Sequence, residues 1–189
     1  YLLVTGITPA LSPSCRKAVE HAIDVARVTD VTVVLDPNVR RKLWSPEKAR
    51  EVLLELLGDV DLLLAAREEA TLLADTDDLE AAVRRLQGRG PEQVVVCTGA
   101  EGAVGFDGAD RYEQAALEVE VVEEVGAGDA FNAGFLSGRM RGWDVPRSLR
   151  LGTILGGLAV TADGDVEGLP TWKEVQTYLG EGDSGSVDR

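Results

Sequence analysis

The chain has 189 residues, and 44% of them are hydrophobic, which is ample for one domain with its own core. It carries 33 acidic and 19 basic residues, for a formal net charge of −14. Such a surface repels nucleic-acid backbones and anionic membranes, so we expect neither as a partner. No apolar run reaches the roughly 18 residues of a membrane span, and no basic flank of a signal peptide precedes the opening "YLLVTG".

Four short apolar segments predict strands that are fully buried in a parallel sheet, because each is rich in β-branched or aliphatic residues. They are Tyr1–Gly6, Val31–Asp36, Val60–Ala66 and Gln93–Gly99. Helical patterns lie between them, at Ser12–Val28, Ser45–Gly58 and Asp77–Gly88. The first two open on Ser-Pro, where the serine caps the helix and the proline takes its first position. This regular alternation predicts an α/β fold with right-handed crossovers.

The pattern changes after Gly102. Alternating residues on either side of Asp107 and Gly108 predict antiparallel strands joined by a tight turn. Three helices are then expected, at about Gly128–Arg141, Arg147–Ala162 and Thr171–Leu179. Residues 1–180 are interpreted as one continuous part of a domain, and the polar, Gly/Ser-rich residues 181–189 as a disordered tail.

The two cysteines, Cys15 and Cys97, lie far apart in dissimilar contexts. A structural metal site would favour a paired spacing, and a secreted scaffold would contain more cysteines. We expect two buried, reduced thiols in a cytoplasmic protein.

The stretch "VGAGDAFNAGFLSG" predicts a helix whose first N–H groups are unpaired and lie at the positive end of its dipole. Gly126 and Gly128 carry no side chain, so a phosphate oxygen has direct access to those donors. Asp129 lies in the first turn, where a carboxylate beside a phosphoryl group can accept a hydroxyl proton. The alternative is an acid that only favours the helix dipole.

Small residues on the following helical turns predict close helix packing. Ala130, Gly134 and Gly138 are four residues apart on one face, and Gly152 with Gly156 offers a matching face on the next helix. The stretch is not a P-loop, because it lacks the Lys-Ser/Thr pair, and Phe131 replaces the third glycine of a dinucleotide fingerprint.

Together with "DPNVRRKLW" and "VVVCTGAEGAV", the glycine–aspartate stretch resembles the ribokinase-like (PfkB) carbohydrate kinase family. Within it the closest likeness is to 2-keto-3-deoxygluconate kinases, through "TGITPALSP" and "DGDVEGLP". The resemblance covers about Tyr1–Leu179 and implies a three-layer α/β/α fold with a mostly parallel sheet. Family members are considerably longer, and their N-terminal part and β lid are absent from this sequence. We therefore expect the C-terminal, nucleotide-binding portion of such a kinase, with little turnover by itself.

The resemblance also implies roles for individual residues. Asp129 would be the general base, and the backbone amides of Gly126, Ala127 and Gly128 would form the anion hole for the γ-phosphate of ATP. Arg40, after a strand's carboxyl end, would pair with the substrate carboxylate, since a guanidinium matches a carboxylate bidentately. A solvated loop arginine is the alternative. Asp36 and Asn38 would shape that loop.

Further assignments follow from the same likeness. The nucleotide-binding residues would be Gly99, Gly102, Gly126, Gly128 and Gly156, although Gly99 and Gly102 also suit a plain turn. Asp165 would contact the substrate, with a simple loop acid as its alternative. Glu69 would act near Mg²⁺ through water, or it is an exposed helix residue.

Several residues depart from the family pattern. Ala66 replaces an asparagine, Cys97 stands where many relatives have Lys or Thr, and Glu123 with Glu124 puts the monovalent-cation site in doubt. The sequence thus predicts an ATP- and Mg²⁺-dependent kinase for 2-keto-3-deoxygluconate or a close analogue such as 2-keto-3-deoxygalactonate, and the full-length protein could form homo-oligomers. A fructokinase or other neutral-sugar kinase and a catalytically silent nucleotide-binding module are the alternatives.

Overall fold

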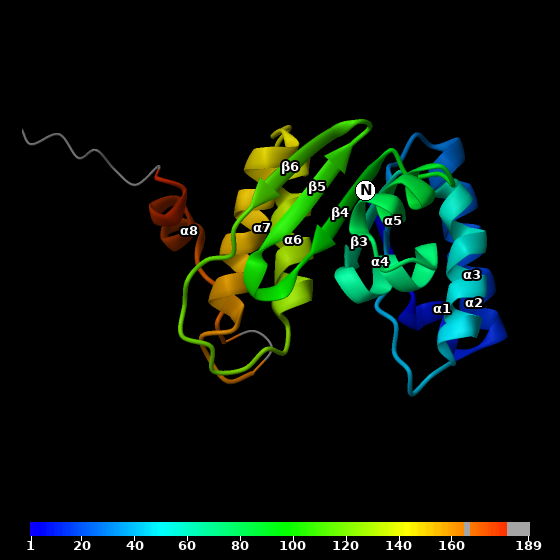
Figure 1. Cartoon of the computed structure of the whole chain (residues 1–189), viewed down its shortest axis with the longest axis horizontal. Helices are drawn as coiled ribbons and strands as arrows, with labels where there is room; N and C mark the ends of the chain where they lie inside the picture. The colour runs from blue at the N-terminus through cyan, green and yellow to red at the C-terminus, as the bar shows by residue number, and fades with distance from the viewer. Residues whose placement is uncertain (165–166, 181–189) are drawn as a thin grey trace, which may run out of the picture. The chain divides into compact units, whose positions relative to one another are not determined.

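The computed structural model describes residues 1–164 and 167–180 (Figure 1). Its strands are β1 (Leu2–Thr5), β2 (Val33–Asp36), β3 (Leu62–Ala66), β4 (Gln93–Cys97), β5 (Ala103–Asp107) and β6 (Asp110–Gln114). Its helices are α1 (Ile7–Leu11), α2 (Pro13–Val28), α3 (Pro46–Leu56), α4 (Arg67–Ala74), α5 (Leu79–Gln87), α6 (Ala127–Met140), α7 (Val145–Ala159) and α8 (Trp172–Leu179). Single 3-10 turns lie at Leu57–Asp59 and Gly99–Glu101.

The residues group into two compact units. Unit 1 comprises Tyr1–Thr98 and Val104–Arg111, and unit 2 comprises Gly99–Ala103 and Tyr112–Arg189. Within the described residues the sheet has six strands in the order β1-β2-β3-β4-β5-β6. The α/β fold class predicted from the sequence is therefore confirmed. The tail predicted for residues 181–189 lies outside the described residues.

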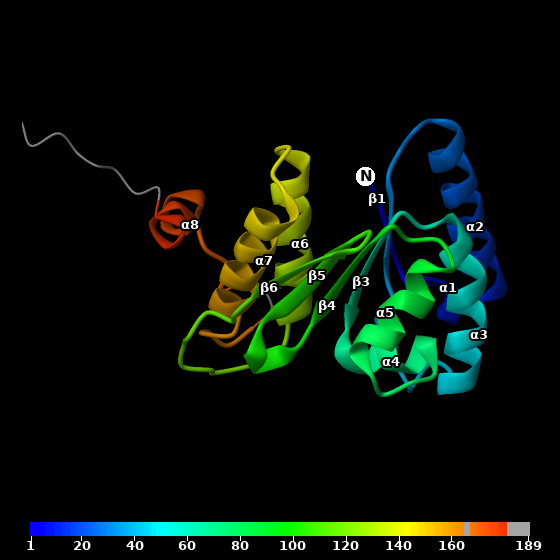
Figure 2. The same cartoon turned by 45° about the horizontal axis from the view of Figure 1, so that its top comes forward.

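Unit 1 is built on parallel strands. β1 pairs with β2, β2 with β3 and β3 with β4, all in parallel. Alternate residues such as Val33 and Leu35 join one apolar core with residues of α2, α3, α4 and α5. Figure 2 shows these helices on one side of the strands. The register places Thr5 opposite Asp36 and Ala66 opposite Cys97, so polar groups gather at the carboxyl ends of the strands.

The helix starts follow the sequence signals. Ser12 Oγ accepts the N–H of Cys15 at 3.1 Å, and Ser45 Oγ accepts the N–H of Lys48 at 3.3 Å. Each serine precedes a proline in the first turn of its helix. α7 begins at Val145, two residues before the predicted start, because the Asp144 carboxylate accepts the N–H of Arg147 at 3.0 Å.

Two expectations about unit 1 are wrong. The first strand is not fully buried: Leu3 is 47% exposed, because β1 is hydrogen-bonded to β2 alone among the described strands. The cysteines are free, as expected, but each residue keeps part of its surface exposed, although the thiol of Cys97 itself is largely withdrawn from solvent. Helix α1, of 5 residues, is not predicted from the sequence, and α4, of 8 residues, is predicted only in the alternative that places Glu69 on a helix. Segments this short carry too few turns for a clear helical period.

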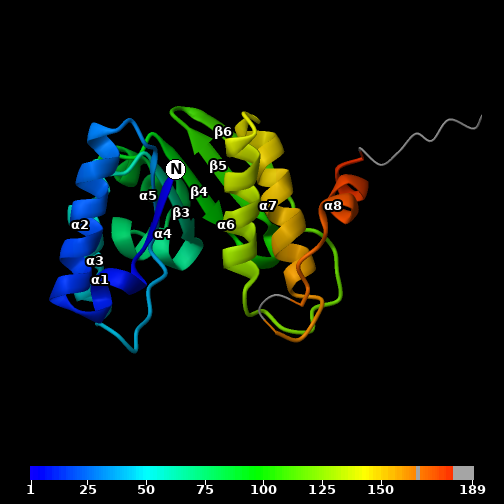
Figure 3. The ribbon, with the colours of Figure 1, turned by 180° about the vertical axis from the view of Figure 1, so that it is seen from behind.

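In unit 2, α6 and α7 lie side by side (Figure 3). A Cβ added at Gly134 would lie 2.9 Å from the Gly152 Cα, and one at Gly138 would lie 3.0 Å from the Ser148 Cα. A Cβ at Gly152 would meet the Phe131 ring at 2.9 Å. The predicted packing of small faces is confirmed, because these distances leave no room for a side chain.

No helix in residues 1–164 and 167–180 is both long and apolar enough to cross a membrane.

Gly134→Ala tests this helix contact. The new methyl group has to displace backbone of α7, so we expect a loss of about 1–3 kcal/mol in the free energy of unfolding, seen as a lower midpoint in thermal or urea unfolding. Gly128→Ala is the matched control on the same helix, because nothing lies within 4 Å of a Cβ there. Equal stability of the two variants would contradict the packing role of Gly134.

Candidate active site

The turn that starts α6 presents free backbone donors. Gly126 precedes the helix in a left-handed conformation with φ 81°, which favours glycine. Ala127 donates its N–H to Glu124 O at 3.4 Å, whereas the N–H groups of Gly128 and Asp129 have no acceptor among the described residues. Gly128 and Asp129 are both exposed. Unpaired donors at the positive end of a helix dipole form a site for an anion.

The segment before this turn is anchored within unit 2. The N–H groups of Val122 and Glu123 both donate to Val160 O, at 2.8 and 3.3 Å. The Glu123 carboxylate accepts the N–H of Gly164 at 3.1 Å. Glu123, which departs from the family pattern, thus holds Gly164 beyond the end of α7. The predicted substrate contact Asp165 lies outside the described residues.

The other predicted nucleotide-binding glycines have different surroundings. Gly99 and Gly102 both have positive φ, 63° and 112°, in the turn between β4 and β5. A Cβ at Gly102 would lie 2.0 Å from Gln114 O, so the chain path requires a glycine there, whereas Gly99 is open. A Cβ at Gly156 would lie 3.1 Å from Ala127 O, directly behind the first residue of α6. Their roles toward a nucleotide stay predictions.

In unit 1 the loop after β2 carries Arg40. The Asp36 carboxylate accepts the N–H of Asn38 at 3.1 Å, and Asn38 has a positive φ of 35°. Asp36 and Asn38 therefore shape the loop, as expected. The Arg40 side chain is exposed, and no described residue pairs with it. Its guanidinium is available to an anionic ligand, and its role toward a substrate stays a prediction.

Glu69 connects that loop to the next strand. One carboxylate oxygen accepts the N–H of Val39 at 2.7 Å, and the other accepts the N–H of Ala66 at 3.0 Å. The first contact bridges two strand ends, and the second caps the start of α4. The sequence reasoning missed the bridge to Val39, because the two residues are 30 positions apart.

Cys97 ends β4 beside these acids. Burial of its thiol, followed by the negative charges of Asp36 and Glu69, raises the pKa of Cys97 to about 12. A thiol with such a pKa is neutral at physiological pH and a poor nucleophile. The parallel sheet thus brings Asp36, Glu69 and Cys97 together at its carboxyl edge.

The described residues include no group of three His, Cys, Asp or Glu side chains placed to hold a metal ion. Both oxygens of Glu69 already accept backbone N–H groups. A carboxylate keeps further lone pairs, so the magnesium role of Glu69 stays a prediction.

The chain belongs to the pfkB family of carbohydrate kinases, which it matches over residues 1–172. It is 36% identical over 187 residues to a 2-dehydro-3-deoxygalactonokinase of Haloferax volcanii, covering 98% of this chain and 58% of that protein. It is 34% identical over 182 residues to a 2-dehydro-3-deoxygluconokinase of Bacillus subtilis, covering 95% of this chain and 56% of that protein. "2-Dehydro" and "2-keto" denote the same substitution.

Solved structures confirm the ribokinase-like fold class. A fructokinase double mutant from Vibrio cholerae O395, with fructose, ADP and potassium bound, superposes with a TM-score of 0.88 at 26% identity. The match covers 94% of this chain and 59% of the fructokinase. The chain therefore spans a little over half the length of the proteins to which it is similar.

Glu69→Ala tests the bridge between the strand ends. We expect the amide hydrogen of Val39 to exchange about tenfold faster or more, because a partly buried N–H loses a charged acceptor. Hydrogen exchange read by NMR measures this. Glu68→Ala, an exposed acid on the same helix, should leave Val39 unchanged. Equal exchange in both variants would contradict the bridge.

The rate at which Cys97 is alkylated depends on the fraction of its thiol that has lost its proton. With the pKa of Cys97 at about 12, its thiolate fraction at pH 8 is about 10⁻⁴, so iodoacetamide should label Cys97 of the folded chain very slowly there. The label is read at Cys97 by peptide mass spectrometry, because Cys15 is a second free thiol. Labelling should rise with pH and become fast once the chain is unfolded in urea. An unfolded thiol loses its proton above about pH 8.5, whereas the folded chain keeps the proton on Cys97 up to about pH 12. The free energy of unfolding should therefore fall progressively as the pH rises from about 8.5 to about 12. Rapid labelling of folded Cys97 at pH 8 would contradict the shift.

Proposed function

We propose that the protein transfers the γ-phosphate of ATP to a hydroxyl of 2-keto-3-deoxygluconate or a close sugar acid such as 2-keto-3-deoxygalactonate. The observation that carries the proposal is the start of α6, where unpaired amides lie next to an exposed carboxylate in a pfkB-family chain. The choice of substrate draws support from the names of the Haloferax and Bacillus relatives.

Asp129 supplies the base. The substrate hydroxyl attacks the γ-phosphorus in line, its oxygen forms the new P–O bond, and the bond to ADP breaks. The hydroxyl proton passes to the Asp129 carboxylate. An exposed carboxylate in the first helical turn reaches a ligand without crossing packed side chains.

The amides of Gly126, Ala127 and Gly128 are proposed to stabilise the phosphate, and the Ala127 N–H would give up its long bond of 3.4 Å to Glu124 O to do so. Negative charge moves over the phosphoryl oxygens during transfer, and fixed N–H dipoles favour that charge without reorganising. Gly128 suits close approach of an oxygen, since a Cβ at this position would have nothing within 4 Å and its hydrogen adds no bulk.

Arg40 orients the sugar acid. Its planar guanidinium matches the two oxygens of a carboxylate and cannot lose its proton at neutral pH. The Glu69 carboxylate holds the neighbouring N–H of Val39, and it therefore fixes the backbone from which Arg40 extends. Asp165 is proposed as a second contact to the sugar acid.

Magnesium, when bound with ATP, would neutralise charge on the phosphates. Glu69 would approach it through water, because its two oxygens already accept N–H groups.

Asp129→Asn in the complete protein tests the base. We expect kcat to fall by about 10²- to 10⁴-fold, because the amide cannot accept the proton. Phosphoryl transfer is measured by coupled ADP release. Asp24→Asn, an exposed helix acid in unit 1, serves as the control for loss of one negative charge. Unchanged transfer in Asp129→Asn would overturn the assignment.

Arg40→Ala tests the substrate class. KM for 2-keto-3-deoxygluconate should rise about tenfold or more, because a charge-assisted hydrogen bond is lost. Arg41→Ala, the exposed neighbour, is the matched control. A wild-type preference for fructose over both sugar acids would favour the fructokinase alternative. Absence of any transfer by the complete protein would favour a silent nucleotide-binding module, an alternative suggested by Ala66 and Cys97.

A further inference from the structure

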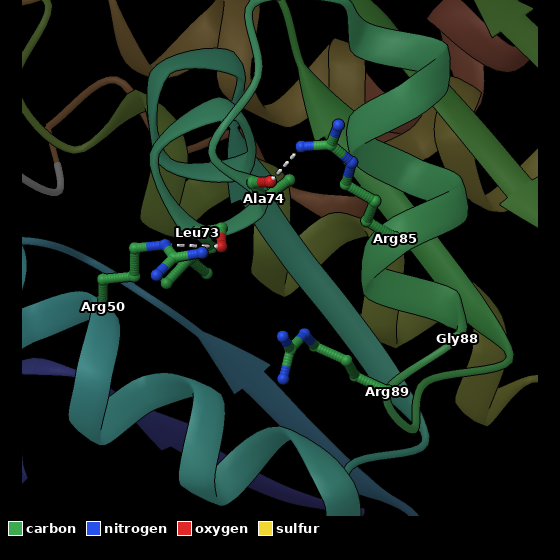
Figure 4. Close-up of a pocket in the computed structure, with 6 residues that line it drawn as sticks. All are labelled: Arg50, Leu73, Ala74, Arg85, Gly88 and Arg89. Atoms are coloured by element: carbon green, nitrogen blue, oxygen red, sulfur yellow. Dashed lines mark hydrogen bonds between the residues drawn. The ribbon is translucent and has the colours of Figure 1, made fainter.

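Three arginines surround a cavity in unit 1 that contains none of the candidate active-site residues. The cavity has a volume of about 390 Å³ and lies among α3, α4 and the end of α5 (Figure 4). Its lining residues are Arg50, Leu73, Ala74, Arg85, Gly88 and Arg89. No acidic side chain is among them, although the chain as a whole carries a net charge of −14. The cavity therefore concentrates positive charge on an otherwise acidic protein.

Two of the arginines are held in place by the end of α4. Arg50 Nε donates to Leu73 O at 3.1 Å, and Arg85 Nη1 donates to Ala74 O at 2.9 Å and to Asp75 O at 2.7 Å. These carbonyls belong to the last turn of a helix, where acceptors lack intrahelical partners. Each contact uses part of a guanidinium and leaves other N–H groups for a ligand.

Bonds to the end of a helix explain the positions of Arg50 and Arg85, but they do not explain the position of the Arg89 side chain. This side chain makes no hydrogen bond or ion pair with the described residues, and Figure 4 shows it extending into the space between α3 and α5. Its backbone is nevertheless fixed. Its N–H donates to Leu86 O at 2.9 Å, and a Cβ at the next residue, Gly90, would lie 2.0 Å from Leu57 O. A fixed turn thus presents an unpaired guanidinium to a cavity that already holds two others.

Like charges brought together in this way repel one another, and an anion between them removes the repulsion. Guanidinium groups offer paired N–H donors that match the oxygens of a phosphate. The cavity volume falls within the range of about 300–1,000 Å³ found for small-molecule sites. It is too small for a folded partner and suits a compact metabolite.

We propose that this cavity binds a small phosphorylated metabolite, with Arg89 as the principal contact and Arg50 and Arg85 as fixed supporting donors. The site is separate in sequence and in residues from the turn at Gly126–Asp129. The proposal is independent of the kinase reaction, because none of the three arginines has a role in it.

Inorganic phosphate and pyrophosphate are the probes. The whole ¹⁵N-labelled chain is titrated with each at constant ionic strength, held with NaCl, and its amide signals are followed by NMR. We expect saturable shifts at the amides of Gly88, Arg89 and Gly90, with pyrophosphate tighter than phosphate. Arg89→Ala should weaken this binding about tenfold, as expected for loss of a charged hydrogen-bond donor. It removes no hydrogen bond found among the described residues, so the fold should be retained.

Arg84→Ala is the matched control. Arg84 lies on α5 and outside the cavity lining, and its nearest carboxylate partner, Glu80, is 3.9 Å away. Its loss changes the net charge equally and should alter the affinity by less than about twofold, since surface ion pairs contribute little. Equal weakening in both variants would indicate a general charge effect and overturn the proposal. Shifts confined to Gly126–Asp129, or no saturation at Gly88–Gly90, would overturn it as well.

Discussion

The N–H groups of Gly128 and Asp129, which find no acceptor among residues 1–164 and 167–180, are the feature on which the proposed chemistry depends. Backbone donors that face no protein acceptor need water or a ligand, and the helix dipole makes an anion the preferred ligand. Gly126 makes the turn possible through its positive φ. The carboxylate of Asp129 follows directly, so the proposed phosphate site and the proposed proton acceptor lie within one helical turn.

The rest of unit 2 holds this turn in place. α6 contacts α7 through glycines, and the two helices approach too closely for side chains at Gly134 and Gly152. The chain before the turn is bonded to Val160 O, at the end of α7, and Glu123 reaches the following loop. The start of α6 is therefore supported from two directions, as a site with preorganised donors requires.

Unit 1 illustrates how a parallel sheet assembles residues that are distant in sequence. Its strands end at one edge, where Asp36, Glu69 and Cys97 meet. Glu69 links two of these strand ends and orders the loop that carries Arg40. Cys97 responds to the same surroundings with a pKa raised to about 12, first through burial and then through the two acids.

Much of this arrangement could be predicted from local sequence, because the signals are local. Short aliphatic runs marked β2, β3 and β4, Ser-Pro pairs marked the starts of α2 and α3, and the glycine–aspartate stretch marked the start of α6. Contacts between distant residues left no such signal. The bridge from Glu69 to Val39 and the cavity formed by Arg50, Arg85 and Arg89 depend on elements that meet only after folding.

Short helices and the edge strand β1 account for the other differences between the predictions from sequence and the structure. α1 and α4 contain too few residues for a helical period, and the exposure of Leu3 depends on which strands lie beside β1. Neither property is encoded in the composition of the segment itself. The roles proposed for Gly99, Gly156 and Asp165 depend on contacts with a bound ligand. Residue type and local spacing do not define those contacts.

A crystal structure of the complete protein with 2-keto-3-deoxygluconate and a non-hydrolysable ATP analogue tests the central claim most directly. The account predicts an oxygen of the outermost phosphate within about 3 Å of the Gly128 nitrogen, and a substrate hydroxyl about 2.6–3.2 Å from the Asp129 carboxylate. A phosphate bound away from the start of α6, or an Asp129 carboxylate that faces neither substrate, would contradict it.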